Sequence, residues 1–241
     1  STHGFSVVNG GSLELTGSGT MNVTGDDVWG FQVVGNTNGA TWADTTAKTT
    51  LTIGPDVVVD VEKGLGVWIG GKGATLNVYG TINSKNDSAI FGNGTRNAAT
   101  NNGGTEINIY DGASVTAKSV AIYQPQLGTV NITGGTVEGY AGIGIKSGTL
   151  NITGGTVRGV ANDDVLDDSY SNTNGIAYDG SAIVIDSYIG YSGQMNLTIS
   201  GDAVVQSLHS TAIHEIGNVA GMTNVVNLKV EGGYLRLTTL V

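Results

Sequence analysis

Three aromatic residues at equivalent places of short apolar segments are the most conspicuous candidates for ligand chemistry. Trp68, Phe91 and Tyr123 each directly follow a branched apolar residue. If that apolar residue points into a core, the ring after it points outward, because side chains alternate along a strand. We therefore predict an exposed aromatic column, a surface that usually marks an interaction site and that can stack on sugar rings. The alternative is that a loop such as 34–49 or 92–104 covers the column.

Asparagines occupy a second set of predicted outward positions, each between two apolar residues. These residues are Asn77, Asn108, Asn131 and Asn151. Their side-chain amides, with the threonines beside them, predict a polar wall that hydrogen-bonds sugar hydroxyls. The alternative is that Asn and Thr stack on one another, as polar ladders do in stacked sheets.

Two tyrosines stand on the same predicted wall. Tyr79 and Tyr110 follow Asn77 and Asn108 by two residues and so point to the same side. They extend the predicted binding surface, or they pack on each other with their hydroxyls in water.

An acidic segment is the candidate metal site. Asp163, Asp164, Asp167 and Asp168 lie within six positions. Calcium takes six to eight oxygen ligands, and such a segment can supply several of them, so calcium is the candidate cofactor. The spacing matches no EF-hand, and a solvated acidic loop is the alternative.

A repeated segment determines how these residues must be positioned. Residues 129–137 and 149–157 are identical except for Val130 and Leu150. Looser copies of the same apolar–polar–apolar plan begin at Leu13, Leu51, Leu76, Ile107, Leu197 and Leu228. A second short apolar unit, the one that holds the aromatics, recurs between them. Each repeat therefore contains about three short strands.

Such short strands cannot bury an apolar face alone, so successive repeats must stack. We predict an all-β chain that forms a single-stranded, right-handed parallel β-helix of about eight coils. A β-sandwich or jelly roll is the competing architecture. Its hairpin signals, Asn-Gly and Asp-Gly dipeptides, occur in the chain but do not set the repeat.

The repeat 128–137 and its twin at 148–157 resemble right-handed parallel β-helix, pectin-lyase-like regions of bacterial cell-surface proteins. The resemblance is strong over 105–160 and is one of repeat style elsewhere. It implies an adhesin or a carbohydrate-binding β-helix, some of which hold calcium. It also implies an extracellular or cell-surface location.

Composition narrows the classes of partner. The chain has 10 basic and 20 acidic residues, a net charge of −10, and no cysteine. This charge repels phosphate backbones and anionic membranes, so we expect no nucleic acid partner. No apolar run approaches the roughly 20 residues of a membrane span, so we expect no membrane insertion.

Catalysis is not predicted. Pectin-degrading β-helix enzymes use clustered carboxylates, or calcium with an Arg or Lys base, and this chain has only Arg96, Arg158 and Arg236, none in a lyase-like motif. The adjacent Asp pairs at 26–27, 163–164 and 167–168 are not carboxylates at the roughly 5 to 10 Å that glycoside hydrolysis needs. A polysaccharide lyase or hydrolase is the third alternative.

We therefore expect a non-catalytic surface module that binds carbohydrate or host glycan through the aromatic column and the Asn/Thr wall. The alternative is a purely structural stalk or spacer. We expect residues 1–241 to form one domain excised from a longer surface protein, with flanking domains of the same polypeptide as partners.

Overall fold

The chain winds through short strands and turns. The computed structural model describes residues 2–35, 48–92, 103–161, 178–186, 195–216 and 226–237. These residues form 24 strands. None of them belongs to a helix that is long and apolar enough to cross a membrane.

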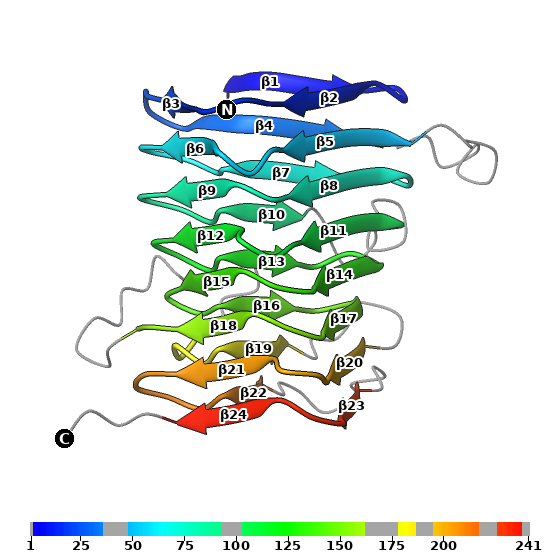
Figure 1. Cartoon of the computed structure of the whole chain (residues 1–241), viewed down its shortest axis with the longest axis vertical. Coiled ribbons are helices and arrows are strands. Elements are labelled where there is room, and N and C mark those ends of the chain that lie inside the picture. Colours follow the sequence, from blue (N-terminus) through cyan, green and yellow to red (C-terminus); the bar gives the residue numbers. More distant parts are fainter. Residues whose placement is uncertain are drawn as a thin grey trace.

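Each coil contributes one strand to each of three parallel sheets, which we name A, B and C (Figure 1). Sheet A contains β1 (Thr2–Val8), β4 (Val28–Val34), β7 (Val67–Gly70), β10 (Ile90–Gly92), β13 (Ile122–Gln124), β16 (Ile143–Ile145), β19 (Ile183–Asp186) and β22 (Ile213–Ile216). Sheet B contains β2 (Ser12–Leu15), β5 (Thr49–Ile53), β8 (Ala74–Val78), β11 (Thr105–Ile109), β14 (Gly128–Ile132), β17 (Gly148–Ile152), β20 (Met195–Ile199) and β23 (Val226–Val230). Sheet C contains β3 (Gly19–Val23), β6 (Val57–Val61), β9 (Thr81–Ser84), β12 (Ser114–Ala117), β15 (Thr136–Gly139), β18 (Thr156–Gly159), β21 (Val204–Ser207) and β24 (Tyr234–Leu237).

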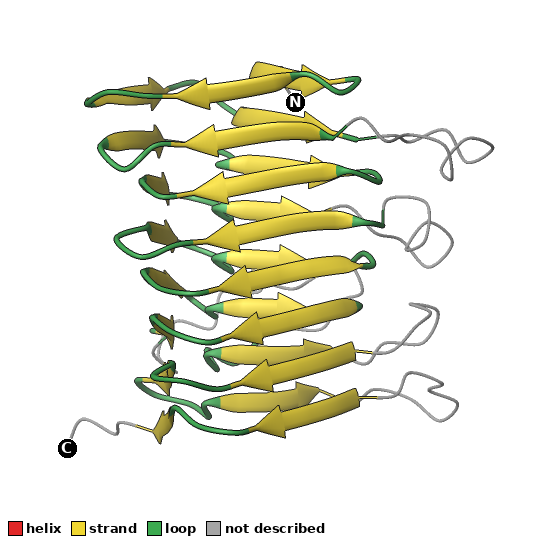
Figure 2. Cartoon of the chain, turned by 45° about the vertical axis from the view of Figure 1, so that its right-hand side comes forward, coloured by secondary structure: helices red, strands yellow, loops and turns green. Residues whose placement is uncertain are grey.

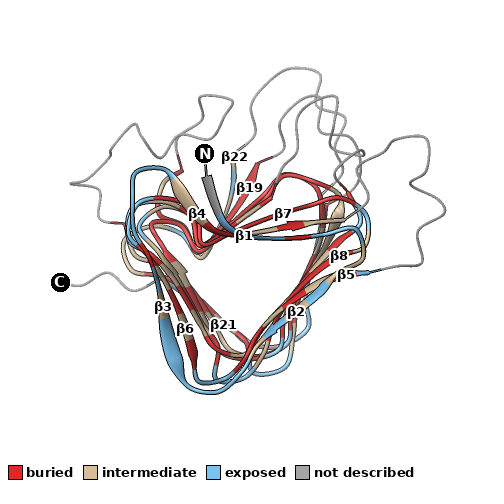
Figure 3. Cartoon of the chain, turned by 90° about the horizontal axis from the view of Figure 1, so that it is seen from above, coloured by how far each residue is buried: buried red, intermediate tan, exposed pale blue. Residues whose placement is uncertain are grey.

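The coils stack directly on one another, and the three sheets enclose a triangular core (Figures 2 and 3). Each sheet has eight strands in coil order, and every pairing is parallel. The chain is therefore a right-handed parallel β-helix of eight coils, which confirms the predicted fold.

Core residues repeat in columns along the axis. In sheet B, Leu76, Ile107, Val130 and Leu150 face one another in register on successive coils. All four are buried. Their outward neighbours are more exposed, because successive side chains of a strand point to opposite faces. Because of this alternation, short strands form a continuous buried core when they stack.

The near-identical segments lie on consecutive coils. Thr129 pairs with Thr149, and Thr136 pairs with Thr156. Between them, Gly135 and Gly155 turn the chain from sheet B to sheet C with φ of 72° and 74°. A Cβ added at Gly155 would lie 2.5 Å from the carbonyl carbon of Gly134. Glycine is needed here because the turn is left-handed and the coil below lies in contact with it.

Candidate functional site

The predicted aromatic column lies on the outer face of sheet A. Phe91 pairs in register with Trp68 on one side and with Tyr123 on the other. The rings of Phe91 and Tyr123 are 4.7 Å apart between centroids and tilted by 33°. Trp29, which the sequence did not single out, stacks on Trp68 at 6.3 Å with an angle of 10° between the rings. The structure thus brings the three predicted aromatics together.

The prediction that this column is exposed is wrong for two of its members. Trp68 is 8% exposed and Tyr123 is 5% exposed, while Phe91 is half-buried. The Trp68 ring lies over Gly70, with Cη2 2.7 Å from where a Cβ would be. Tyr123 packs in a second apolar cluster with Tyr178 and other buried residues. The rings are therefore largely covered and offer little free face to a ligand.

Tyr178 supplies a further aromatic ring to the column. Gly144 follows Tyr123 in register, and its missing side chain leaves a gap on the outer face. Tyr178 fills this gap, with Cε2 2.5 Å from the position of a Cβ at Gly144. The sequence has no aromatic residue at this point of the column. The only sequence signal for a further ring is the glycine itself, because an outward glycine leaves room for a ring from another part of the chain.

A buried ion pair lies beside the column. Lys146 and Asp186 directly follow Ile145 and Ile185, which pair in register. The Nζ and Oδ2 atoms are 3.2 Å apart, and both side chains are 0% exposed. The Nζ atom is also 5.5 Å from the ring centroid of Tyr123. This pair was not predicted from the sequence, although the segments Ile-Gly-Ile-Lys and Ile-Val-Ile-Asp place both charges at one position of the repeat.

Burial dominates the electrostatics of this pair. Desolvation lowers the pKa of Lys146 and raises the pKa of Asp186, and the attraction between the two groups opposes both shifts. A charge removed from water is costly unless a partner compensates it. Each of the two charges therefore compensates the cost of burying the other.

A second polar cluster surrounds Asp179, just before β19. One carboxylate oxygen accepts hydrogen bonds from the backbone N–H and the hydroxyl of Ser181, at 3.1 and 2.7 Å. The other accepts from the hydroxyl of Ser210 at 3.0 Å and lies 2.6 Å from Nδ1 of His214. Burial alone raises the pKa of Asp179, but the hydrogen bonds from Ser181 and Ser210 and the charge of His214 together lower it below its usual value.

This cluster gives a prediction about acid stability. A carboxylate with a lowered pKa stabilises the folded state above its ordinary pKa of about 3.9, and this stabilisation is lost as the pH falls through the lowered value. We expect Asp179→Asn to lower the free energy of unfolding at neutral pH and to flatten its fall below about pH 4. Urea unfolding at a series of pH values measures both effects. The exposed Asp56→Asn is the control, and an unchanged acid slope in Asp179→Asn would contradict the assignment.

The predicted polar wall lies on the outer face of sheet B. Asn77, Asn108, Asn131 and Asn151 stand side by side on four successive coils. The Nδ2 group of each later residue donates to Oδ1 of the one before, at 3.0, 2.9 and 3.0 Å. We name this set the Asn ladder. The alternative of a stacked polar ladder is thus what the structure contains.

Two asparagines of the ladder also donate hydrogen bonds to residues outside it. Asn77 donates to the hydroxyl of Thr52 at 3.4 Å, and Asn108 also donates to Glu106 at 3.1 Å. A primary amide has two N–H donors and one oxygen with two lone pairs. Asn131 and Asn151 each use one donor in the ladder, so one N–H of each points away from it.

The two tyrosines of the wall pack on each other. Tyr79 and Tyr110 lie 4.2 Å apart between centroids and are nearly parallel, at 3°. Both are half-buried. Partial burial is the main cause that raises the pKa of Tyr110, and the neighbouring Tyr79 hydroxyl and Glu106 raise it further. Each ring thus has one of its two faces covered by the other ring.

Sheet C carries a similar pattern on its outer face. Asn83 donates to Asp60 at 2.7 Å, and the hydroxyl of Thr116 donates to Asn83 at 2.9 Å. Two coils further along the same column, Arg158 donates to Glu138 at 2.7 Å. On the outer faces of sheets B and C, polar side chains thus bind their neighbours along the axis.

The Asn ladder gives a second prediction. Asn131→Ala removes one hydrogen bond to Asn108 and one from Asn151. We expect the free energy of unfolding to fall by about 1–2 kcal/mol, because each bond contributes roughly 0.5–1.5 kcal/mol. Chemical denaturation measures the change, with the exposed Asn22→Ala as the control, for which we expect a change within about 0.5 kcal/mol. Equal effects of the two substitutions would contradict a stabilising ladder.

The predicted calcium segment, Asp163, Asp164, Asp167 and Asp168, lies outside the described residues. Within the described ranges, no group of three or more His, Asp or Glu side chains is arranged to hold a metal ion. Calcium at 163–168 stays a prediction.

Comparison with known proteins adds no relative. No family model, curated protein or solved structure matches this chain. The parallel β-helix is observed directly. The resemblance to pectin-lyase-like regions stays a prediction.

Proposed function

We propose that this chain is a non-catalytic spacer module of a bacterial cell-surface protein, built like the pectin-lyase-like β-helices. The observation that carries the proposal is the Asn ladder, in which outward amides bond to the coils above and below. A stack whose surface groups are bonded along the axis resists bending and opening of single coils.

The covered aromatic column supports the same proposal. Trp68 and Tyr123 are buried on the outer face of sheet A, so they stabilise the stack instead of displaying free ring faces. The ion pair of Lys146 and Asp186 next to them is also closed to solvent. These aromatic and charged side chains therefore hold neighbouring coils together.

Rigidity is the property to measure. The chain has no cysteine, so Ser18→Cys and Asp202→Cys provide two unique spin-label sites at the same corner of the first and seventh coils. We expect one narrow distance distribution near 29 Å, which is about six coil spacings of roughly 4.8 Å. A broad or two-peaked distribution would contradict a rigid spacer. Ser18→Cys with Asn22→Cys, both on the first coil, controls for label flexibility.

The second candidate function is carbohydrate or glycan binding on the sheet B wall. It is favoured by one N–H each on Asn131 and Asn151 that the ladder does not use, on the wall that also carries the half-buried Tyr79 and Tyr110. A binder of this kind retains glycans on an array and loses them in Tyr110→Ala but not in the distant Asn22→Ala. A spacer retains none, with or without a chelator.

A further inference from the structure

The buried ion pair of sheet A places a primary amine against a carboxyl group. Lys146 directly follows β16 and Asp186 ends β19, and the register of Ile145 with Ile185 brings the two side by side. Nζ of Lys146 lies 3.2 Å from Oδ2 of Asp186. Because Oδ2 is bonded to Cγ, the amine lies beside the carbon atom that it would attack to form an amide.

Strands on both sides enclose the pair. The backbone N–H of Lys146 donates to the carbonyl of Gln124 in β13 at 2.9 Å, and Asp186 pairs in register with Ile216 in β22. The Nζ atom also lies 5.5 Å from the ring centroid of Tyr123. Both charged side chains are 0% exposed. The pair is therefore buried by strands before and after it in the stack.

Burial favours the uncharged forms of both groups. Desolvation lowers the pKa of Lys146 and raises the pKa of Asp186. Transfer of one proton from the ammonium to the carboxylate removes both charges from a site where charge is costly. The transfer leaves a neutral amine, which is a nucleophile when desolvated, beside a neutral carboxylic acid.

Position and dryness favour a reaction between these two groups. Reacting groups that are held in contact and well oriented reach effective molarities of about 10⁵–10⁸ M. The neighbouring cluster is apolar and includes Val120, Tyr123, Tyr178 and Val184. Such surroundings exclude water, which would otherwise hydrolyse the product.

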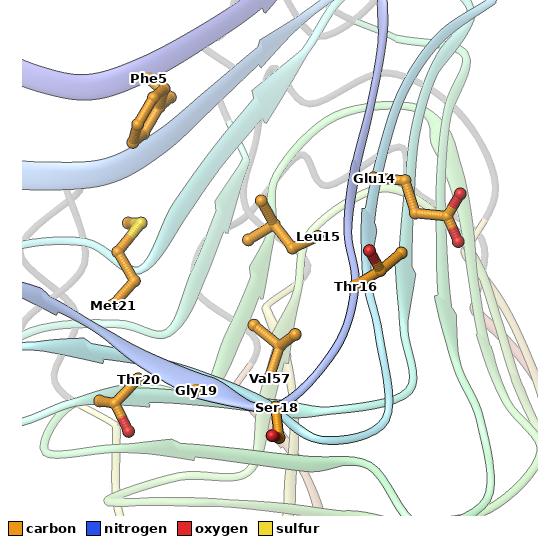
Figure 4. Close-up of a pocket in the computed structure, with 9 residues that line it drawn as sticks. All are labelled: Phe5, Glu14, Leu15, Thr16, Ser18, Gly19, Thr20, Met21 and Val57. Atoms are coloured by element: carbon orange, nitrogen blue, oxygen red, sulfur yellow. The ribbon is translucent and has the colours of Figure 1, made fainter.

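Other parts of the described chain lack this combination. Lys85 and Asp60 also form an ion pair between neighbouring coils, but their side chains are 54% and 20% exposed. A solvated lysine amine is protonated at neutral pH and is not a nucleophile. The pocket on the first coil has no lysine among its nine lining residues, of which Glu14 is the only charged one (Figure 4). Contact and burial thus coincide at Lys146 and Asp186.

We propose that Lys146 and Asp186 condense to form an amide cross-link between the sixth and seventh coils. A proton first passes from Nζ to the carboxylate, and the neutral amine then attacks Cγ. The Nζ–Cγ bond forms, and the bond between Cγ and one carboxyl oxygen breaks. That oxygen leaves as water, with its own proton and one proton from the amine. No further reactant is needed.

The cross-link goes beyond the spacer role and does not depend on it. It closes the chain between Lys146 and Asp186 into a covalent loop. A link of this kind stabilises a fold mainly by restricting the unfolded chain. The sixth and seventh coils then stay joined even when the chain is denatured.

Mass spectrometry of the intact, unmodified chain under denaturing conditions tests the proposal. We expect a species lighter than the sequence mass by one water, and fragmentation that places the loss on a branched peptide joining Lys146 to Asp186. Lys146→Arg keeps a cation but has no primary amine, so we expect the full mass of its sequence. Lys85→Arg is the matched control and is expected to retain the loss of one water.

Two results would overturn the proposal. The first is the absence of the lighter species after prolonged incubation of the unmodified chain, in a sample that circular dichroism shows to be folded. The second is a loss of water that persists in Lys146→Arg, which would indicate a succinimide at an Asp-Gly sequence such as Asp111-Gly112. The first readout uses the unmodified chain, so a folding defect of a variant does not affect it. Any fraction of full mass retains the ion pair, and unfolding experiments on the pair use that fraction.

Discussion

We expect Lys146→Met to lower the free energy of unfolding by about 3–5 kcal/mol, the cost of leaving one partner of a buried ion pair uncompensated. The substitution keeps most of the side-chain volume beside Tyr123, but it removes the charge that lies 3.2 Å from Asp186. Asp186 is then a carboxylate that is fully buried without its cation. Urea unfolding monitored by circular dichroism measures the loss.

The double variant separates charge from packing. We expect Lys146→Met with Asp186→Leu to recover most of the lost stability, because replacing both members of a buried pair by apolar residues is often neutral or stabilising. If the double variant is as unstable as Lys146→Met alone, the pair is not the source of the effect. A loss below about 1 kcal/mol in Lys146→Met, the range of an exposed pair, would contradict its burial.

The second large effect is expected at Gly144. Gly144→Val introduces a Cβ that would lie 2.5 to 2.9 Å from ring atoms of Tyr178. The ring must move off sheet A, and overpacking of this kind costs about 1–3 kcal/mol. The φ angle of Gly144 is not in the left-handed region, so the cost comes from the ring and not from the backbone. Thermal unfolding reports the shift.

Two further variants test the cause. Gly19→Val is the matched control, because an added Cβ there meets no atom within 4 Å. Tyr178→Ala removes the obstructing ring, so we expect Gly144→Val to cost much less in that background. Equal costs in both backgrounds would show that Tyr178 does not occupy the gap over Gly144.

The fold was predictable because stacking repeats leave a strong pattern in the chain. The twin segments 129–137 and 149–157 indicated equivalent coils, and an asparagine between two apolar residues indicated both the strand and its outward face. Register followed from the same pattern, which is why Trp68, Phe91 and Tyr123 pair as predicted. These features depend on residues close together in the sequence.

Burial of the outward residues was not predictable in the same way. Whether Tyr123 is exposed depends on Tyr178, a residue 55 positions further along the chain that enters the gap at Gly144. Trp68 is covered in part because its ring folds onto Gly70. Rotamers and contacts between distant segments decide such features, and a repeat pattern does not encode them.

The contacts of the polar residues were also only partly predictable from the sequence. The Asn ladder was one of the two alternatives predicted for the wall. The alternation of side chains along a strand places an amide outward, but it does not show whether that amide bonds its neighbour or is free to bind a ligand. The pair of Lys146 and Asp186 had a signal in the repeat, since both follow the last apolar residue of a sheet A strand. In the folded chain both side chains are buried and form an ion pair.

The central claim is that the outward amides of sheet B bond from coil to coil. Hydrogen exchange of side-chain amides, followed by NMR, tests it most directly. We predict that the amides of Asn108, Asn131 and Asn151 exchange about five- to tenfold more slowly than that of the exposed Asn22, the factor given by a hydrogen bond of roughly 1 kcal/mol. Exchange of all four amides at the same rate would contradict the claim.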